Sequence, residues 1–126
     1  MAYQRKTEKD VRCPLEYGID VFGGKWNSRI ICVLAHNEPL RYSDIRREMV
    51  NITDAVLASA LKDLVQNELV IRKSFDEIPP KVVYELSEKG HTVVPILQSI
   101  CKWAGMTYRD DEKFRKLQCE KCSYEG

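Results

Sequence analysis

The sequence lacks any long apolar run, and its 20 Lys and Arg residues almost balance its 19 Asp and Glu residues. A membrane-spanning helix needs about 20 consecutive apolar residues, so none is expected. The polar opening MAYQRKTEKD also lacks the apolar centre of a secretion signal. With a formal net charge of only +1, any attraction to nucleic acid must come from a local arrangement of charges. These features predict a soluble, cytoplasmic protein of one domain with no membrane partner.

Motifs for catalysis and cofactor binding are also scarce. The chain has no phosphate-binding glycine loop and no recognisable trio of nucleophile, base and orienting acid. Its two histidines, His36 and His91, stand far apart in the sequence without other ligands beside them. We therefore expect no enzyme activity, no cofactor and no bound metal. The main alternative in this class is a thiol oxidoreductase that uses a C-x-x-C pair near the end of the chain.

The five cysteines are an odd number in a chain long enough to bury a core, which argues against a disulfide framework. Cys13 directly precedes Pro14 at the expected start of a helix, where unpaired backbone N–H groups and the helix dipole stabilise a thiolate. Cys13 is therefore the candidate redox-sensing residue, and an inert small residue is the alternative. Cys119 and Cys122 form the C-x-x-C pair, which supplies only half of a tetrahedral zinc site.

Helical periodicity and end signals divide most of the chain into five helices. They are expected at approximately residues 14–22, 26–36, 44–50, 54–66 and 88–109. Ser43, Thr53 and Ser87 stand where side chains cap the starts of the third, fourth and fifth helices. The fourth helix has one apolar stripe, so its opposite side is predicted to remain free.

Two short strands are expected between the fourth and fifth helices. LVIRKSF (69–75) and KVVYELS (81–87) have mixed β-branched and aromatic content, and DEIPP separates them. Pro79 and Pro80 cannot donate ladder hydrogen bonds, so they belong to a stiff hairpin tip. The predicted fold is mainly α with a small β-hairpin: a winged helix-turn-helix with flanking dimerisation helices. It would occupy residues 12–109, between a flexible arm (1–11) and a polar tail (110–126).

Several short motifs carry a family resemblance. They are Cys13-Pro14, GGKW (23–26), LKDL (61–64) and, above all, IPPKVVYELSEKG (78–90), followed by Pro95 and Trp103. Through them, residues 12–104 resemble the HxlR-type transcriptional regulators, a branch of the MarR-like winged-helix proteins. The resemblance implies a homodimer built from the first and last helices and, in several members, a response to oxidants or electrophiles through the cysteine before the first helix. The corresponding interface residues are Leu15, Ile19, Phe22, Ile96, Leu97, Ile100 and Trp103.

The resemblance also implies that two winged units bind operator DNA. In such a fold the fourth helix enters the major groove and the hairpin lies beside it. Small side chains permit a close approach to base edges, and Ser, Thr and Lys can donate hydrogen bonds there. The expected contacts are Thr53, Ala55, Ala58, Ser59 and Lys62 on this helix, Arg46 and Arg47 on the preceding helix, and Arg72, Lys73 and Lys81 in the hairpin. Asp54, in contrast, would repel phosphate.

The sequence therefore predicts a transcriptional regulator that binds specific sequences of double-stranded DNA as a homodimer. Acidic and basic residues are equal in number from Arg41 to Lys81, so DNA affinity depends on how the folded chain sorts them. A winged-helix module that binds proteins without specific DNA binding is the alternative, in which these residues form an ordinary solvated surface. The sequence names no small-molecule effector.

Overall fold

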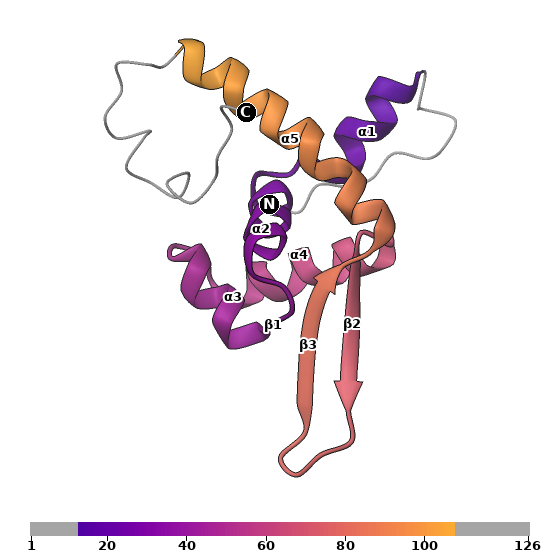
Figure 1. Ribbon diagram of the computed structural model, residues 1–126, viewed down its shortest axis with the longest axis vertical. Helices are drawn as coiled ribbons and strands as arrows, with labels where there is room; N and C mark the ends of the chain where they lie inside the picture. The colour runs from indigo at the N-terminus through magenta and orange to yellow at the C-terminus, as the bar shows by residue number, and fades with distance from the viewer. Residues whose placement is uncertain (1–12, 108–126) are drawn as a thin grey trace.

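The computed structural model describes residues 13–107, apart from the side chains of Phe22, Met106 and Thr107. This part of the chain forms five helices and three strands in the order expected for a winged helix-turn-helix, which confirms the predicted fold (Figure 1). The helices are α1 (Pro14–Phe22), α2 (Lys25–Asn37), α3 (Tyr42–Met49), α4 (Asp54–Gln66) and α5 (Glu88–Thr107). The strands are β1 (Leu40–Arg41), β2 (Val70–Phe75) and β3 (Lys81–Leu86).

The arm 1–11, Cys119 and Cys122 lie outside the described residues, so the predictions made for them stay predictions. Within residues 13–107, no helix is both long and apolar enough to cross a membrane.

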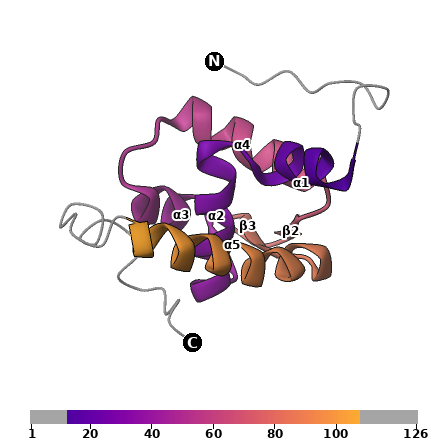
Figure 2. The same ribbon diagram turned by 90° about the horizontal axis from the view of Figure 1, so that it is seen from above.

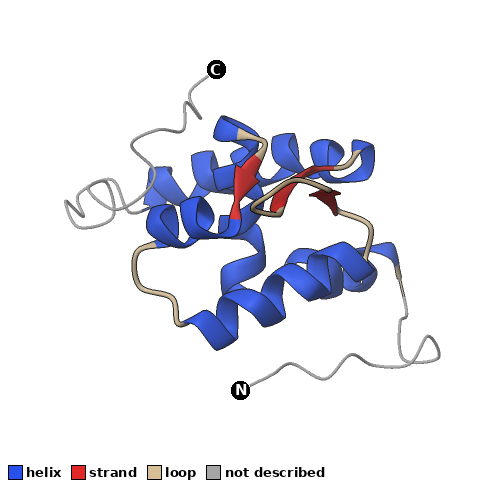
Figure 3. Cartoon of the chain, turned by 90° about the horizontal axis from the view of Figure 1, so that it is seen from below, coloured by secondary structure: helices blue, strands red, loops and turns tan. Residues whose placement is uncertain are grey.

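Helix α2 forms the centre of the core. Its side chains Ile30, Ile31 and Leu34 are completely buried, and α2 contacts α3, α4, α5 and β3. Full burial of an apolar side chain of this size contributes about 1.5–3 kcal/mol, so this one helix holds the others in place. Figure 2, seen from above, shows α2 between α5 and α4. Helices make up most of the body, and the strands are confined to one small sheet (Figure 3).

The sheet is antiparallel with the strand order β1-β3-β2. Its first strand is the two-residue piece that pairs Leu40 with Tyr84 and Arg41 with Val83. The hairpin formed by β2 and β3 projects from the body at the end opposite α1 and α5 (Figure 1). The molecule therefore has two opposite ends, one formed by α1 and α5 and the other by the tip of the hairpin.

Two of the three predicted helix caps are confirmed. The Thr53 hydroxyl accepts a hydrogen bond from the Val56 N–H at 3.2 Å, which fixes the start of α4. The Ser87 hydroxyl accepts one from the Gly90 N–H at 2.9 Å at the start of α5. Both bonds satisfy backbone donors that have no partner within the helix.

The predicted cap at Ser43 is wrong. Helix α3 begins at Tyr42, and Arg41 occupies the capping position with an extended backbone. Its N–H donates to the Asp44 carboxylate at 3.3 Å. The reason is the pairing of Arg41 with β3, which holds that residue extended and lets the helix begin directly after it.

The first turn of α5 packs directly against the backbone that precedes β2. A Cβ atom added at Gly90 would lie 2.1 Å from the carbonyl oxygen of Leu69. The same oxygen accepts a hydrogen bond from the Ser87 N–H at 3.0 Å, so it cannot move away without losing that bond. Only glycine fits this contact.

We expect Gly90→Ala to lower the free energy of unfolding by roughly 1–3 kcal/mol or more, because the added methyl group overlaps rigid backbone. Urea unfolding followed by circular dichroism measures the change. Gly24→Ala is the matched control, since its added Cβ would lie 3.7 Å from the nearest atom, in the Asn27 side chain. Equal stability of the two variants would contradict the close packing at Gly90.

Candidate nucleic-acid interface

Helix α4 has one buried and one exposed face, as its sequence predicts. Leu57, Ala60, Leu61 and Leu64 are buried in the core. The predicted DNA contacts of this helix are all exposed: Ala55, Ala58, Ser59 and Lys62, with Thr53 at the cap. The free face is therefore a row of small and hydrogen-bonding side chains beside one positive charge.

A groove of about 280 Å³ lies between α4 and the hairpin. Ala58, Lys62 and Gln66 line it from α4, and Arg72 and Tyr84 line it from the hairpin. The fold thus brings together three predicted DNA contacts from two elements, Ala58, Lys62 and Arg72.

The two basic residues of β2 lie on opposite faces of the hairpin because side chains alternate along a strand. Arg72 is paired with Tyr84, faces the groove, and donates to the Ser74 hydroxyl at 3.2 Å. Lys73 is directed to the other face, where its Nζ lies 3.0 Å from a carboxylate oxygen of Glu85. Only Arg72 shares a surface with α4.

Lys81 lies at the outer end of the hairpin, where β3 begins. It is paired with Phe75, and its Nζ lies 5.4 Å from the centre of the Phe75 ring. The fully exposed Ile78 stands in the connection just before it. Lys81 is therefore the cation held at the end of the hairpin that projects farthest from the body (Figure 1).

The two arginines of α3 are paired with carboxylates. Arg46 Nε lies 2.5 Å from Asp54 Oδ1, and Arg47 Nη1 lies 3.3 Å from Asp44 Oδ1. The Tyr42 hydroxyl donates to the backbone carbonyl of Asp54 at 3.1 Å. Partial burial, together with the nearby Asp54 carboxylate, raises the pKa of Tyr42, so this hydroxyl keeps its proton as a donor. The Arg46–Asp54 pair joins two helices and therefore leaves no local pattern in the sequence, whereas Asp44 and Arg47 stand three residues apart on α3, a spacing at which such pairs form.

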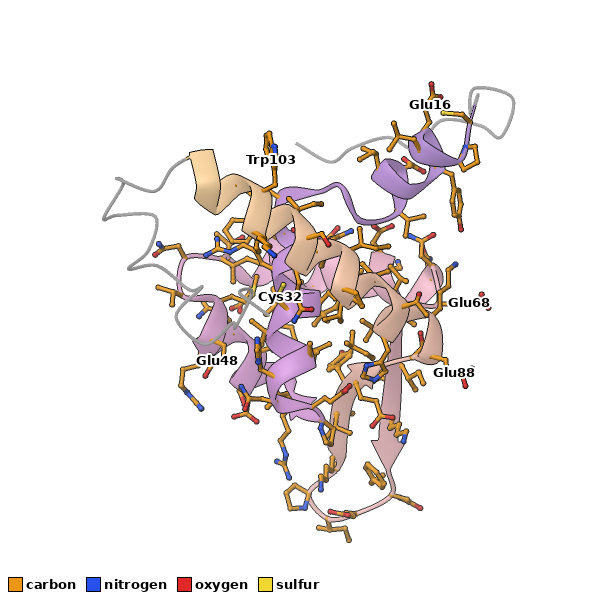
Figure 4. The ribbon with its side chains drawn as sticks, turned by 45° about the horizontal axis from the view of Figure 1, so that its top comes forward. Glu16, Cys32, Glu48, Glu68, Glu88 and Trp103 are labelled. Carbon is orange, nitrogen blue, oxygen red and sulfur yellow. The ribbon has the colours of Figure 1, made fainter. Side chains whose placement is uncertain are left out.

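The opposite end of the molecule carries exposed apolar side chains on α1 and α5. Five of the residues predicted for a dimer interface are among them: Leu15, Ile19, Ile96, Ile100 and Trp103. Leu15 and Trp103 are 71% and 65% exposed, which is unusual for large apolar side chains. Figure 4 shows Trp103 directed away from the body of the protein.

Leu97 does not belong to this exposed set, which sets it apart from the other residues predicted for the interface. It is only 6% exposed and is part of the core cluster of the single chain. Leu97 follows Val93 by four residues and therefore lies on the same buried side of α5, whereas Ile96 is turned outward. The side chain of Phe22 lies outside the described part of the structure.

Cys13 occupies the capping position before α1, with an extended backbone and an exposed side chain. Its carbonyl oxygen accepts a hydrogen bond from the Glu16 N–H at 3.0 Å. Cys32 and Cys101 are partly buried, and Cys32 packs against the core. Within residues 13–107, no three His, Cys, Asp or Glu side chains are grouped closely enough to hold a metal ion.

Comparison with known proteins identifies the fold's family. The sequence profile described as "HxlR-like helix-turn-helix" matches residues 21–112, most of the chain. The chain belongs to the HxlR-like helix-turn-helix family. A curated relative, the uncharacterized HTH-type transcriptional regulator BH0655 of Halalkalibacterium halodurans, is 39% identical over 101 residues, which is 80% of this chain and 89% of the relative.

Solved structures of similar proteins agree with this HxlR-like assignment. The crystal structure of the HTH-type transcriptional regulator ytcD matches with a TM-score of 0.73 and 34% identity over 78% of this chain and 99% of that chain. The reduced form of the transcriptional regulator YodB from B. subtilis matches with a TM-score of 0.68 and 36% identity over 82% and 98% of the two chains. The redox regulator HypR in its oxidized form matches with a TM-score of 0.70 and 35% identity over 78% and 99%. Together with the family match, these relatives confirm the prediction of a helix-turn-helix transcriptional regulator.

Proposed function

We propose that this HxlR-like protein controls transcription as a homodimer that binds a two-fold symmetric operator in double-stranded DNA. The observation that carries the proposal is the groove where the free face of α4 meets the Arg72 face of the hairpin. Ala55 and Ala58 leave room for the backbone of α4 to approach base edges, and Ser59 and Lys62 can donate hydrogen bonds to them. Thr53 stands at the end of the helix that would enter the groove first.

The hairpin and α3 would supply contacts to the sugar-phosphate backbone. Arg72 shares the surface of α4, and Lys81 stands at the projecting tip, so both are proposed as phosphate contacts. Lys73, Arg46 and Arg47 each already have a carboxylate partner, which compensates their charge and weakens any further contact with a phosphate. In a two-fold dimer the half-sites would be separated by about 34 Å, one turn of DNA, or a multiple of it.

The exposed apolar end of the molecule supports the homodimer. Five large apolar side chains are about half exposed or more at this end: Leu15 and Ile19 on α1, and Ile96, Ile100 and Trp103 on α5. Exposed apolar side chains grouped in this way are typical of a protein-protein contact. Burial of such surface contributes about 25 cal/mol per Å², and aromatic and large aliphatic side chains dominate stable interfaces. Because this end lies opposite the hairpin tip, dimerisation there leaves both DNA-reading surfaces free (Figure 1).

One observation favours the second candidate, a module that binds protein partners. Three basic residues predicted to contact DNA, Arg46, Arg47 and Lys73, are already paired with carboxylates, which lowers the positive potential around them. Salt dependence separates the two functions, because phosphate contacts release counterions and make DNA affinity fall steeply as salt rises.

Cys13 is proposed as the site of a redox response. Its thiol is exposed at the N-terminus of α1, a helix that also carries the exposed Leu15 and Ile19. The relative HypR is described as a redox regulator, and the relative YodB is known in a reduced form. Oxidation of Cys13 would add polar atoms beside the proposed dimer interface, change the spacing of the two α4 helices and release the operator.

We expect Lys81→Ala to weaken binding to all DNA sequences and to lower the slope of log affinity against log salt by about one unit, because one phosphate contact is lost. Ser59→Ala and Lys62→Ala should instead change which bases are preferred. Fluorescence anisotropy with a duplex selected by the wild-type protein from a random-sequence pool measures both. Lys102→Ala, an exposed change on α5, is the control. Salt-independent binding, or none, would favour the protein-binding alternative.

Ile100→Glu is expected to convert the dimer to a monomer, because a carboxylate buried in an apolar interface without a partner costs several kcal/mol. Sedimentation velocity measures the mass, and circular dichroism verifies folding. Lys102→Glu is the matched control, since Lys102 is exposed on the same helix but lies outside the row formed by Ile96, Ile100 and Trp103. A dimer that survives Ile100→Glu would contradict the proposed interface.

Hydrogen peroxide should lower the operator affinity of the wild-type protein, and dithiothreitol should restore it, because sulfenic acid and disulfide products of a thiol are reversible. Cys13→Ser is expected to keep its affinity throughout the treatment. Cys101→Ser, in a partly buried position, is the control and should respond like the wild type. If Cys13→Ser remained sensitive to peroxide, another thiol would be the sensor.

A further inference from the structure

Asp54 is an acidic residue on a surface that otherwise suits DNA. It is the first residue of α4, directly after the Thr53 cap, and its side chain is 74% exposed. A carboxylate at this position is favourable for the helix, since it lies near the positive end of the helix dipole. For DNA binding it is unfavourable, because the same helix end would approach a negatively charged backbone.

The Asp54 carboxylate is held by neighbours on α3. Its Oδ1 lies 2.5 Å from Arg46 Nε. The Tyr42 hydroxyl lies 3.1 Å from the Asp54 carbonyl oxygen and 3.4 Å from Oδ1. The carboxylate therefore points toward α3, with the guanidinium of Arg46 against it.

Asp54 and a DNA phosphate compete for the same guanidinium. Arg46 lies on the helix that would cross the DNA backbone, where an arginine is suited to bind phosphate. The ion pair engages Arg46 Nε and turns the guanidinium toward Asp54, and the carboxylate compensates its charge, so a phosphate gains less from the N–H groups that remain. A contact between Arg46 and a phosphate therefore adds little DNA affinity while the Asp54 carboxylate is present.

We propose that Asp54 limits the DNA affinity of this protein by holding Arg46 away from the phosphate backbone. The inference rests on the proposed function and adds a residue that lowers the DNA affinity. Because phosphate contacts carry no sequence information, the restraint lowers sequence-independent binding and leaves base readout to the exposed face of α4. Removal of the carboxylate frees Arg46 for a phosphate.

The test uses the full chain and four proteins: wild type, Asp54→Asn, Arg46→Ala and the double variant. Asparagine keeps the shape of the side chain, and the helix keeps its Thr53 cap. Anisotropy titrations across a range of salt use the duplex selected by the wild type and an unrelated duplex of the same length. Asp54→Asn is expected to bind both duplexes roughly tenfold more tightly near 0.1 M salt, with a slope steeper by about one unit.

The double variant identifies the group responsible. Arg46→Ala should change wild-type affinity by less than about twofold, yet it should remove the whole gain in the Asp54→Asn background, a strongly non-additive pair. Equal losses from Arg46→Ala in both backgrounds would overturn the inference, because Arg46 would then contact DNA with the carboxylate present. Unchanged affinity and slope in Asp54→Asn would overturn it as well.

Two further outcomes distinguish other roles of Asp54. Weaker binding of Asp54→Asn to the selected duplex alone would mean that the carboxylate accepts a hydrogen bond from a cytosine amino group, and the restraint would be rejected. Tyr42→Phe removes the hydroxyl bond but no charge, so a gain equal to that of Asp54→Asn would assign the effect to helix position and also reject it. If no protein bound either duplex, the proposed function itself would fail, and the inference with it.

Discussion

The structure depends on the burial of one side of α2. Ile30, Ile31 and Leu34 have no exposed surface, and the elements packed around them form both functional ends of the molecule. Helix α4 turns its leucines inward against this centre and leaves its small and polar side chains outside. Helix α5 likewise packs its buried side chains against this centre, so that one buried helix determines the direction of the proposed DNA-reading face and of the apolar end.

The sequence predicted the helices, the hairpin and two caps because those signals are local. Thr53 and Ser87 bond to backbone groups three residues away, a pattern that can be read directly from the chain. Ser43 was assigned wrongly because the start of α3 depends on a strand pairing with residues some forty positions later. Leu97 was grouped with the exposed side chains of α5 because this helix is apolar on several sides, and periodicity alone does not separate a buried apolar face from an exposed one.

The pairing of charges on and around the proposed DNA surface could not be read from the sequence either. The sequence shows equal numbers of acidic and basic residues in this region, but not which of them meet. In the structure Lys73 is turned to Glu85 and Arg46 to Asp54, whereas Arg72 and Lys62 line one groove. The fold therefore sorts a neutral set into a small cationic groove and several internally compensated pairs, an arrangement typical of a protein whose binding depends on position more than on total charge.

The backbone before β2 packs tightly against the first turn of α5. The Leu69 carbonyl oxygen accepts a hydrogen bond from the Ser87 N–H and lies against Gly90, so the first turn of α5 is in direct contact with the backbone that leads into β2. These two contacts join the base of the hairpin to the first turn of the long helix. In the proposed dimer, a tilt of a few degrees between the two α5 helices would be magnified at the distant hairpin tips, which would then no longer fit two successive turns of a double helix.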